Sequence, residues 1–245
     1  MDSPLPILYQ DDAIVAVHKP SGLLVHRSPI DRHETAFALQ QVRDQLGCWV
    51  YPVHRLDKPT SGVLLFALGR DMARALSQQF AEQSVGKHYL ALVRGYSPES
   101  GVIDHALKDK ADPLLDKRRS KPAEARPART SYRQLARVEI PVSVDRYPQS
   151  RYSLLDLKPE SGRKHQLRRH MKHIGHPIIG DAKHGKGVHN RYFQQAYDCH
   201  RLLLACYALE ISHPGNGRPV RIEAPLDGSF RRLVEVFNWT GVLPV

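Results

Sequence analysis

The sequence has few cysteines and no long apolar run. Its three cysteines, Cys48, Cys199 and Cys206, form no CxxC pair, so neither a disulfide framework nor a zinc ribbon is expected. No apolar stretch approaches the roughly 20 residues that a membrane-spanning helix needs. The opening segment, MDSPLPILYQDD, is acidic and contains proline, unlike a signal peptide. These absences predict a cytoplasmic protein that does not associate with membranes.

The usual motifs of nucleotide-hydrolysing, dinucleotide-binding and zinc-protease sites are also absent. The chain contains no P-loop, no GxGxxG and no HExxH. Four histidines lie close together in the sequence, namely His165, His170, His173 and His176. Only His170 and His173 can share a face of one helix, and no acidic third ligand lies nearby. We therefore predict a site without a metal ion and without a cofactor.

Acidic residues are too few to balance the basic ones. The 245 residues include 36 Lys or Arg against 25 Asp or Glu, which gives a formal net charge of +11 and a sequence pI of about 9.7. Such a charge favours a polyanionic partner, with nucleic acid ahead of an anionic membrane surface. The apolar content of 41% is sufficient for a well-buried core.

Strand and helix patterns are interspersed without strict alternation and without an internal repeat, which favours an α+β domain around a mixed sheet. Strands are predicted at 13–18, 62–68, 89–93, 130–135, 152–157 and 202–211, the last being the final strand candidate, and one helix carries Met72, Leu76 and Phe80. Residues 109–129 are rich in basic residues and proline, so we expect a mobile basic loop that orders on RNA. No linker divides residues 1–245, which predicts a single domain.

Asp57 is the first candidate for chemistry. It lies in the turn-forming segment His54-Arg55-Leu56-Asp57-Lys58-Pro59-Thr60-Ser61-Gly62, where side chains are displayed rather than packed. A carboxylate displayed between basic neighbours is a plausible nucleophile. The alternative is structural, because the same aspartate could simply close an Asx turn.

A basic helix offers a partner for Asp57. Leu167, Met171 and Ile174 define its buried stripe at about 100° per residue, and Arg163 stands one turn earlier at the head of that stripe. A buried guanidinium needs a carboxylate, so we expect Arg163 to pair with Asp57 and keep it ionised. Alternatively, Arg163 faces solvent at a frayed helix start.

The flanks and outer face of this helix are expected to track phosphates. Residues 161–174 contain no Asp or Glu, whereas an ordinary solvated helix mixes in acids. The cations assigned to this surface are Lys164, His165, Arg168, Arg169 and Lys172.

The Asp57 segment resembles the catalytic signature of the RluA-type pseudouridine synthases. The resemblance covers essentially the whole chain, because further matching segments follow in the family's order. They are Lys19-Pro20-Ser21-Gly22-Leu23-Leu24-Val25-His26, Lys87-His88-Tyr89-Leu90-Ala91-Leu92-Val93-Arg94-Gly95, Ser161-Gly162-Arg163-Lys164-His165-Gln166-Leu167-Arg168, His176-Pro177-Ile178-Ile179-Gly180-Asp181 and Arg201-Leu202-Leu203-Leu204.

The resemblance implies the pseudouridine synthase catalytic fold, a mixed and mainly antiparallel sheet flanked by helices and loops. It implies Asp57 as the nucleophile, Tyr89 as the ring that stacks on the target uracil and takes the C5 proton, and Arg163 as the partner of Asp57. Arg55 is similar to the arginine that holds the place of the flipped nucleotide, and Leu204 to a pocket-wall residue. No cofactor is implied, and attack at C6 or at C1′ of the uridine stays open.

Within the family the chain resembles the tRNA branch that acts at uridine 65, on the segments His26-Arg27-Ser28, Asp31-Arg32, Arg146-Tyr147-Pro148 with Arg151-Tyr152, Gln166-Leu167-Arg168-Arg169-His170 and Asn190-Arg191. No S4-like module is expected before the first motif. The chain departs from many relatives at His184-Gly185, where they carry Tyr-Gly, and at Ala205-Cys206. We expect a monomer that modifies tRNA. Three alternatives remain: a ribosomal RNA pseudouridine synthase, a non-catalytic RNA-binding protein or chaperone, and a metal-dependent RNA hydrolase.

Overall fold

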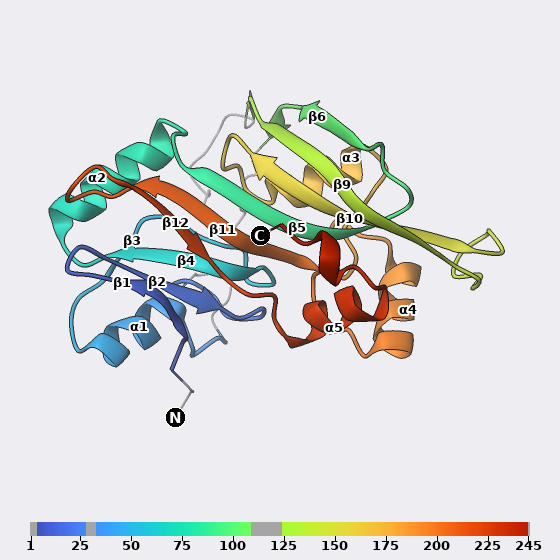
Figure 1. Cartoon of the computed structure of the whole chain (residues 1–245), viewed down its shortest axis with the longest axis horizontal. Helices are drawn as coiled ribbons and strands as arrows, with labels where there is room; N and C mark the ends of the chain where they lie inside the picture. The colour runs from blue at the N-terminus through green and yellow to red at the C-terminus, as the bar shows by residue number, and fades with distance from the viewer. Residues whose placement is uncertain (1–3, 28–32, 109–123, 245) are drawn as a thin grey trace.

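The computed structural model describes residues 4–27, 33–108 and 124–244. A ten-stranded sheet runs through it, with helices on both faces (Figure 1). Its strand order is β1 (Ile7–Gln10), β2 (Ile14–Lys19), β4 (Ser61–Ala67), β11 (Leu204–Ser212), β5 (Gly86–Arg94), β10 (Ser150–Pro159), β9 (Arg129–Ile140) and β6 (Ser100–Asp104). The remaining two strands are β3 (Tyr51–Pro52), which pairs with β4, and β12 (Pro219–Glu223), which pairs with β11.

The sheet is mixed and mainly antiparallel. In the described ranges β11 runs parallel to β4, whereas the other neighbouring strands pair antiparallel. The helices are α1 (Ala38–Leu46), α2 (Arg70–Ala81), α3 (Gln166–His173), α4 (Gly187–Tyr197), α5 (Gly228–Val236) and the short 3₁₀ turn η1 (Thr240–Val242). The α+β fold class predicted from the sequence is confirmed.

The central strands are apolar on both faces because helices cover both. In β5, Leu90 and Leu92 belong to the core cluster that includes α4 and α5, whereas Ala91 and Val93 belong to the cluster that includes α3. In β4, alternate residues likewise pack toward α1 and toward α2. Each large apolar side chain buried in this way contributes about 1.5–3 kcal/mol, so the strands that carry the site are firmly held.

Most of the predicted strands and the helix at Met72 are present, with boundaries shifted by a few residues. The strand predicted at 202–211 is not the last strand, because β12 follows it, and α5 follows β12. Of the predicted mobile loop, residues 109–123 lie outside the described residues, while Ala125–Arg126 forms β8, paired with β7 (Leu107–Lys108), and β9 begins at Arg129. No helix in the described ranges is long and apolar enough to cross a membrane.

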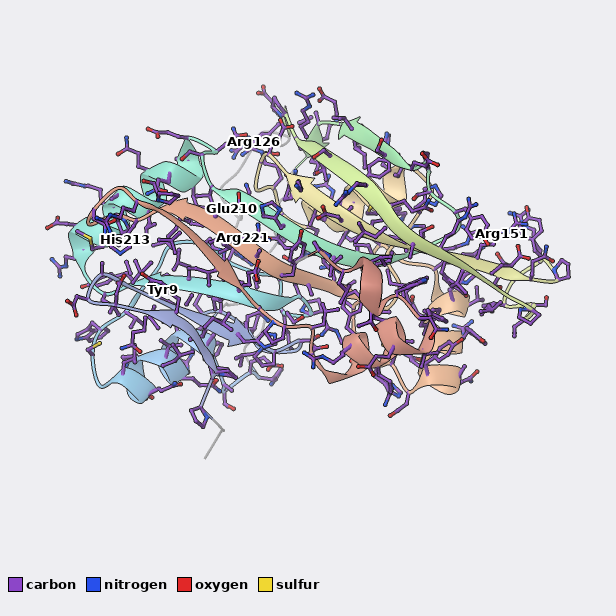
Figure 2. The ribbon with its side chains drawn as sticks, in the orientation of Figure 1. Tyr9, Arg126, Arg151, Glu210, His213 and Arg221 are labelled. Carbon is purple, nitrogen blue, oxygen red and sulfur yellow. The ribbon has the colours of Figure 1, made fainter. Side chains whose placement is uncertain are left out.

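The sheet surface and its two ends carry charged side chains. Glu210 on β11 pairs with Arg221 on β12, and Figure 2 shows the two side by side on the strands nearest the viewer. His213 and Arg151 lie toward opposite ends of the molecule in the same view. Arg151 pairs with Glu139 across β10 and β9 at 2.6 Å.

Candidate active site

The pairing of β4 with β11 and of β11 with β5 brings the candidate residues together. The loop that carries Asp57 leads into β4, whose first residues pair with Ala205 and Cys206 of β11. Cys206 in turn pairs with Tyr89 of β5. Residues far apart in the sequence therefore meet beside the start of α3.

A cavity of about 490 Å³ opens at this place, a volume typical of a ligand pocket. It is lined by eight of the ten side chains singled out from the sequence, which are Asp57, Tyr89, Arg163, Arg55, Leu204, Lys164, His165 and Arg168. Arg169 does not line it. Arg55 and Lys164 are exposed at its edge, and Leu204 is buried in its wall, as expected for a pocket-wall residue.

His54 anchors the front of the Asp57 loop. Its Nε2 accepts a hydrogen bond of 3.0 Å from the backbone N–H of Leu65 in β4, and its ring stacks on Phe80 of α2. An imidazole nitrogen can accept only when it carries no proton. In agreement, burial and then the charge of Lys87 lower the pKa of His54 to about 4, so the ring is neutral at neutral pH.

Lys19 anchors the rear of the same loop. Its fully buried ammonium donates to the carbonyl oxygens of Pro20, Leu23 and Lys58 at 2.8, 2.7 and 3.1 Å. Three carbonyl acceptors match the three N–H donors of an ammonium group. The Lys19–Gly22 turn is thereby joined to the residue that follows Asp57, so the nucleophile candidate stands between two anchored points.

Asp57 is held by an arginine, but not by the one predicted. Its Oδ2 accepts a hydrogen bond of 3.0 Å from Nη1 of Arg168. The same guanidinium donates from Nε and Nη2 to the two carboxylate oxygens of Asp181, at 2.7 and 2.8 Å. Side-chain exposure falls from 20% for Asp57 to 7% for Arg168 and 0% for Asp181. One buried arginine therefore joins two carboxylates.

The prediction that Arg163 pairs with Asp57 is wrong. Helix α3 begins only at Gln166, and His165 before it has a left-handed φ of 55°, so the helical spacing does not extend back to Arg163. Its Nε donates instead to the carbonyl oxygen of Pro127 at 3.2 Å. Arg168 is not a phosphate-tracking cation of the outer face, because it is 6% exposed and its Nε, Nη1 and Nη2 each donate to a carboxylate.

The electrostatics of this arrangement favour an ionised Asp181. Burial alone would raise the pKa of Asp181, but the hydrogen bond from Arg168 and those from the backbone N–H groups of His184 and Lys183 lower it overall. Although burial acts to lower the pKa of Arg168, its two carboxylate partners raise it. Arg168 thus stays charged next to Asp57.

Tyr89 faces the same cavity from β5. Burial, followed by the neighbouring Cys206 thiol and the charge of Asp57, raises its pKa well above the ordinary value of 10. The ring is therefore a neutral phenol at neutral pH. Leu204 and Tyr89 form apolar parts of the lining, which suits a flat, uncharged heterocycle.

Sequence reasoning missed two features of the site, the role of Arg168 as the partner of Asp57 and the role of Asp181. Asp181 stands in one of the matching segments, yet nothing in its spacing indicates that it reaches Arg168. In the part of the chain that the structure describes, no group of three or more His, Cys, Asp or Glu side chains is arranged to hold a metal ion.

Comparison with known proteins decides the family. A model of the RNA pseudouridylate synthase family matches residues 13–173, a stretch that contains Asp57, Tyr89 and Arg168. The chain belongs to the RNA pseudouridylate synthase family. The chemistry of that family is an isomerisation, so the chain is an RNA-modifying isomerase, and its resemblance to the RluA-type enzymes is confirmed.

Curated relatives and solved structures agree with this family. The tRNA pseudouridine synthase C of Pectobacterium carotovorum subsp. carotovorum is 52% identical over 240 residues, covering 98% of this chain, and this chain spans 64% of that protein's length. The tRNA pseudouridine synthase C of Vibrio parahaemolyticus is 49% identical over 235 residues, which is 96% of each chain.

Among solved structures, human RNA pseudouridylate synthase domain containing 4 has a TM-score of 0.70 and 25% identity, covering 95% of this chain and 93% of its own. Human RNA pseudouridylate synthase domain containing 1 has a TM-score of 0.68 and 24% identity over 98% of both chains. The predicted pseudouridine synthase fold is confirmed.

Proposed function

We propose that this protein converts a uridine of tRNA to pseudouridine and that Asp57 is the nucleophile. The observation that carries the proposal is the contact between Asp57 and Arg168 inside a cavity that Tyr89 also lines. The choice of tRNA rests on the names of the relatives that match nearly the whole chain. The choice of uridine 65 rests on the branch-specific resemblance of the sequence.

The geometry leaves Asp57 ready to attack. Arg168 cannot lose its proton at neutral pH and occupies Oδ2 of the carboxylate. In the described part of the chain Oδ1 has no hydrogen-bond partner, so it is free to meet a nucleotide. A carboxylate that is ionised yet partly shielded from water is the form that covalent catalysis requires.

The reaction needs no redox step and no hydrolysis. Asp57 adds to C6 of the uracil or to C1′ of the ribose, and the bond between N1 and C1′ breaks. The uracil turns within the cavity, C5 forms the new bond to C1′, the bond to Asp57 is broken, and the proton lost from C5 is balanced by the proton that N1 gains. The product has the same atoms as the substrate, so the site must chiefly hold a flipped base and exclude water.

Tyr89 and the exposed cations take the remaining roles. The neutral ring of Tyr89 stacks on the uracil, and its hydroxyl relays the C5 proton, accepting it while passing its own proton on toward N1, so that the phenol stays neutral. Arg55 and Lys164, both exposed at the edge of the cavity, contact the phosphates on either side of the flipped nucleotide. Arg163 lines the cavity as well and is proposed to contact RNA rather than Asp57.

The test is to incubate the protein with unmodified tRNA in chelator and to map pseudouridine through its chemical adduct and reverse-transcription stops. Asp57→Asn, which keeps the shape and removes the charge, is expected to abolish product formation while RNA affinity changes by less than a few-fold. Asp44→Asn is the matched control, because Asp44 lies on the surface with a side chain 66% exposed. Substantial activity of Asp57→Asn would overturn the nucleophile assignment.

The substrate is tested in the same assay by a parallel incubation with ribosomal RNA. A single stop in the tRNA at uridine 65 supports the full proposal. A ribosomal site would retain the chemistry and replace the substrate. Absence of pseudouridine in both RNAs would favour the non-catalytic RNA-binding alternative.

A further inference from the structure

Two histidines form a chain that ends at Asp57. His165 lies just before α3 and His184 lies in the turn that follows Asp181. Nδ1 of His165 is 3.0 Å from Nε2 of His184, and the rings meet edge to face. On its other side, Nε2 of His165 is 3.9 Å from Oδ2 of Asp57. His165 also lines the cavity.

The contact between the two rings is one N–H···N hydrogen bond, so only one of the two facing nitrogens carries a proton. Burial first, and then the charges of Arg168, His184 and Lys183, lower the pKa of His165 to about 4 although Asp57 acts in the opposite direction. Burial also lowers the pKa of His184, helped by Arg168, Lys172 and Lys183 against Asp181. Both rings are therefore neutral at neutral pH, and each carries one N–H.

Two arrangements of this proton are possible. If His165 donated through Nδ1, its bare Nε2 would direct a lone pair at the anionic Asp57. If His184 donates through Nε2, Nδ1 of His165 accepts and its Nε2–H faces the carboxylate. The second arrangement places a positive edge next to a negative charge, and Coulomb's law favours it at this distance.

We propose that His184 is a positioning residue, whose Nε2–H donates to His165 and fixes that ring with its own Nε2–H directed toward Asp57 and the target nucleotide. The inference rests on the proposed function, since it assigns the neighbour of the proposed nucleophile. At 3.9 Å from Asp57 the N–H is too far for a full hydrogen bond. It is therefore available to an acceptor oxygen of the flipped nucleotide.

The backbone shows why His184 is suited to this role. Its N–H donates to Oδ1 of Asp181 at 2.9 Å, and the N–H of Gly185 donates to the carbonyl oxygen of Asp181 at 3.0 Å. The same Asp181 holds Arg168, which holds Asp57. One short turn thus supports the nucleophile in two ways, through a charged arginine and through a neutral imidazole that adds no further positive charge.

The first experiment reads the protons directly and needs no RNA. Long-range NMR correlations of histidine-labelled protein distinguish protonated from bare ring nitrogens, and loss of signals in His165→Phe and His184→Phe assigns the two rings. The expected result at neutral pH is that both rings are protonated at Nε2 and that Nδ1 of His165 has the shift of a hydrogen-bonded acceptor. Protonation of His165 at Nδ1 would overturn the proposal.

The second experiment measures activity on tRNA. His184→Phe keeps a ring and removes the donor, so kcat is expected to fall about ten-fold, the effect of losing one orienting hydrogen bond, with KM for tRNA within two-fold. His184→Gln supplies an N–H at a similar place and is expected to recover most of kcat. Equal kcat in Phe and Gln variants would overturn the positioning role. An inactive wild-type protein would instead count against the proposed function.

Discussion

At the scale of single residues, the site depends on the shape of one guanidinium. Arg168 uses Nε and Nη2 for Asp181 and Nη1 for Asp57. Only a planar group with several fixed donors can serve two carboxylates in this way, and the ammonium of lysine, a point charge, cannot. The cost of burying Asp181 is offset by this contact, so catalysis and stability depend on the same side chain.

Removal of the guanidinium should therefore destabilise the fold. Arg168→Met leaves Asp181 buried and unpaired, and we expect the free energy of unfolding in urea to fall by about 3–5 kcal/mol. Arg163→Met removes a side-chain hydrogen bond to a backbone carbonyl and should lose less than about 1 kcal/mol. Adding Asp181→Asn to Arg168→Met should recover part of the loss. Equal, small losses for both arginines would contradict this account.

At the scale of elements, the loop before β4 holds Asp57 through His54, which accepts the N–H of Leu65 only when neutral. Because the pKa of His54 is about 4 in the folded protein and about 6.5 when unfolded, the unfolded chain binds more protons between these values. The stability that this difference represents is complete above pH 6.5 and is lost as the pH falls toward 4.

We expect this loss to amount to roughly 2–3 kcal/mol for His54. His54→Gln keeps an acceptor for the N–H of Leu65 without a titrating ring. Its free energy of unfolding, measured by urea titration at pH 7 and at pH 4.5, should therefore fall less with acid than that of the wild type. Other buried histidines contribute equally to both proteins. If the free energy of unfolding falls equally with acid in the wild type and in His54→Gln, the loss does not come from protonation of His54.

The junction of β4 and β11 makes a second prediction at this scale. Gly62 has a φ of +115°, and a Cβ there would lie 2.0 Å from the carbonyl oxygen of Cys206, on the strand that pairs with Tyr89. Gly47 also has a positive φ, +66°, but open space around it. Gly47→Ala should cost about 1 kcal/mol.

Gly62→Ala should cost more than 3 kcal/mol, because backbone cannot yield as a flexible side chain does. Thermal unfolding of both variants, followed by circular dichroism, checks the difference. If the unfolding midpoint drops equally in Gly47→Ala and Gly62→Ala, the close approach of β4 and β11 is not as rigid as its geometry implies.

The elements show where sequence reasoning succeeds. Apolar runs such as those of β4, β5 and β10 are buried on both faces and were predicted nearly in place. β12 and α5 have no counterpart among the predictions, which place no strand or helix after Ile211. The spacing of apolar residues predicts Arg163 as the partner of Asp57 only if an ideal helix extends back through His165, whose positive φ rules this out. A φ angle of that sign at a non-glycine residue cannot be read from the spacing of apolar residues. The single-domain prediction stays a prediction.

At the scale of the whole molecule, the net charge is +11. For RNA to reach Asp57, some of the basic side chains must lie on the surface around the cavity. The cavity opens beside α3, and α3 packs against the opposite face of β5 from α5. Lys164 and Lys172 are exposed on the α3 side, and Arg218 and Arg231 are exposed on the β11–β12 turn and on α5. Substitution of one pair or the other tests which side of the molecule binds RNA, because the two double variants have the same net charge.

Lys164→Glu with Lys172→Glu should weaken tRNA binding at least ten-fold and reduce the slope of log K against log salt concentration by about 1–2, since each lost phosphate contact removes about one unit. Arg218→Glu with Arg231→Glu lowers the net charge by the same amount and should leave the slope nearly unchanged. Fluorescence anisotropy with labelled tRNA over about 50–200 mM salt gives both slopes. Equal effects of the two pairs would mean that binding follows total charge, and that the cavity beside α3 does not fix the orientation of the RNA.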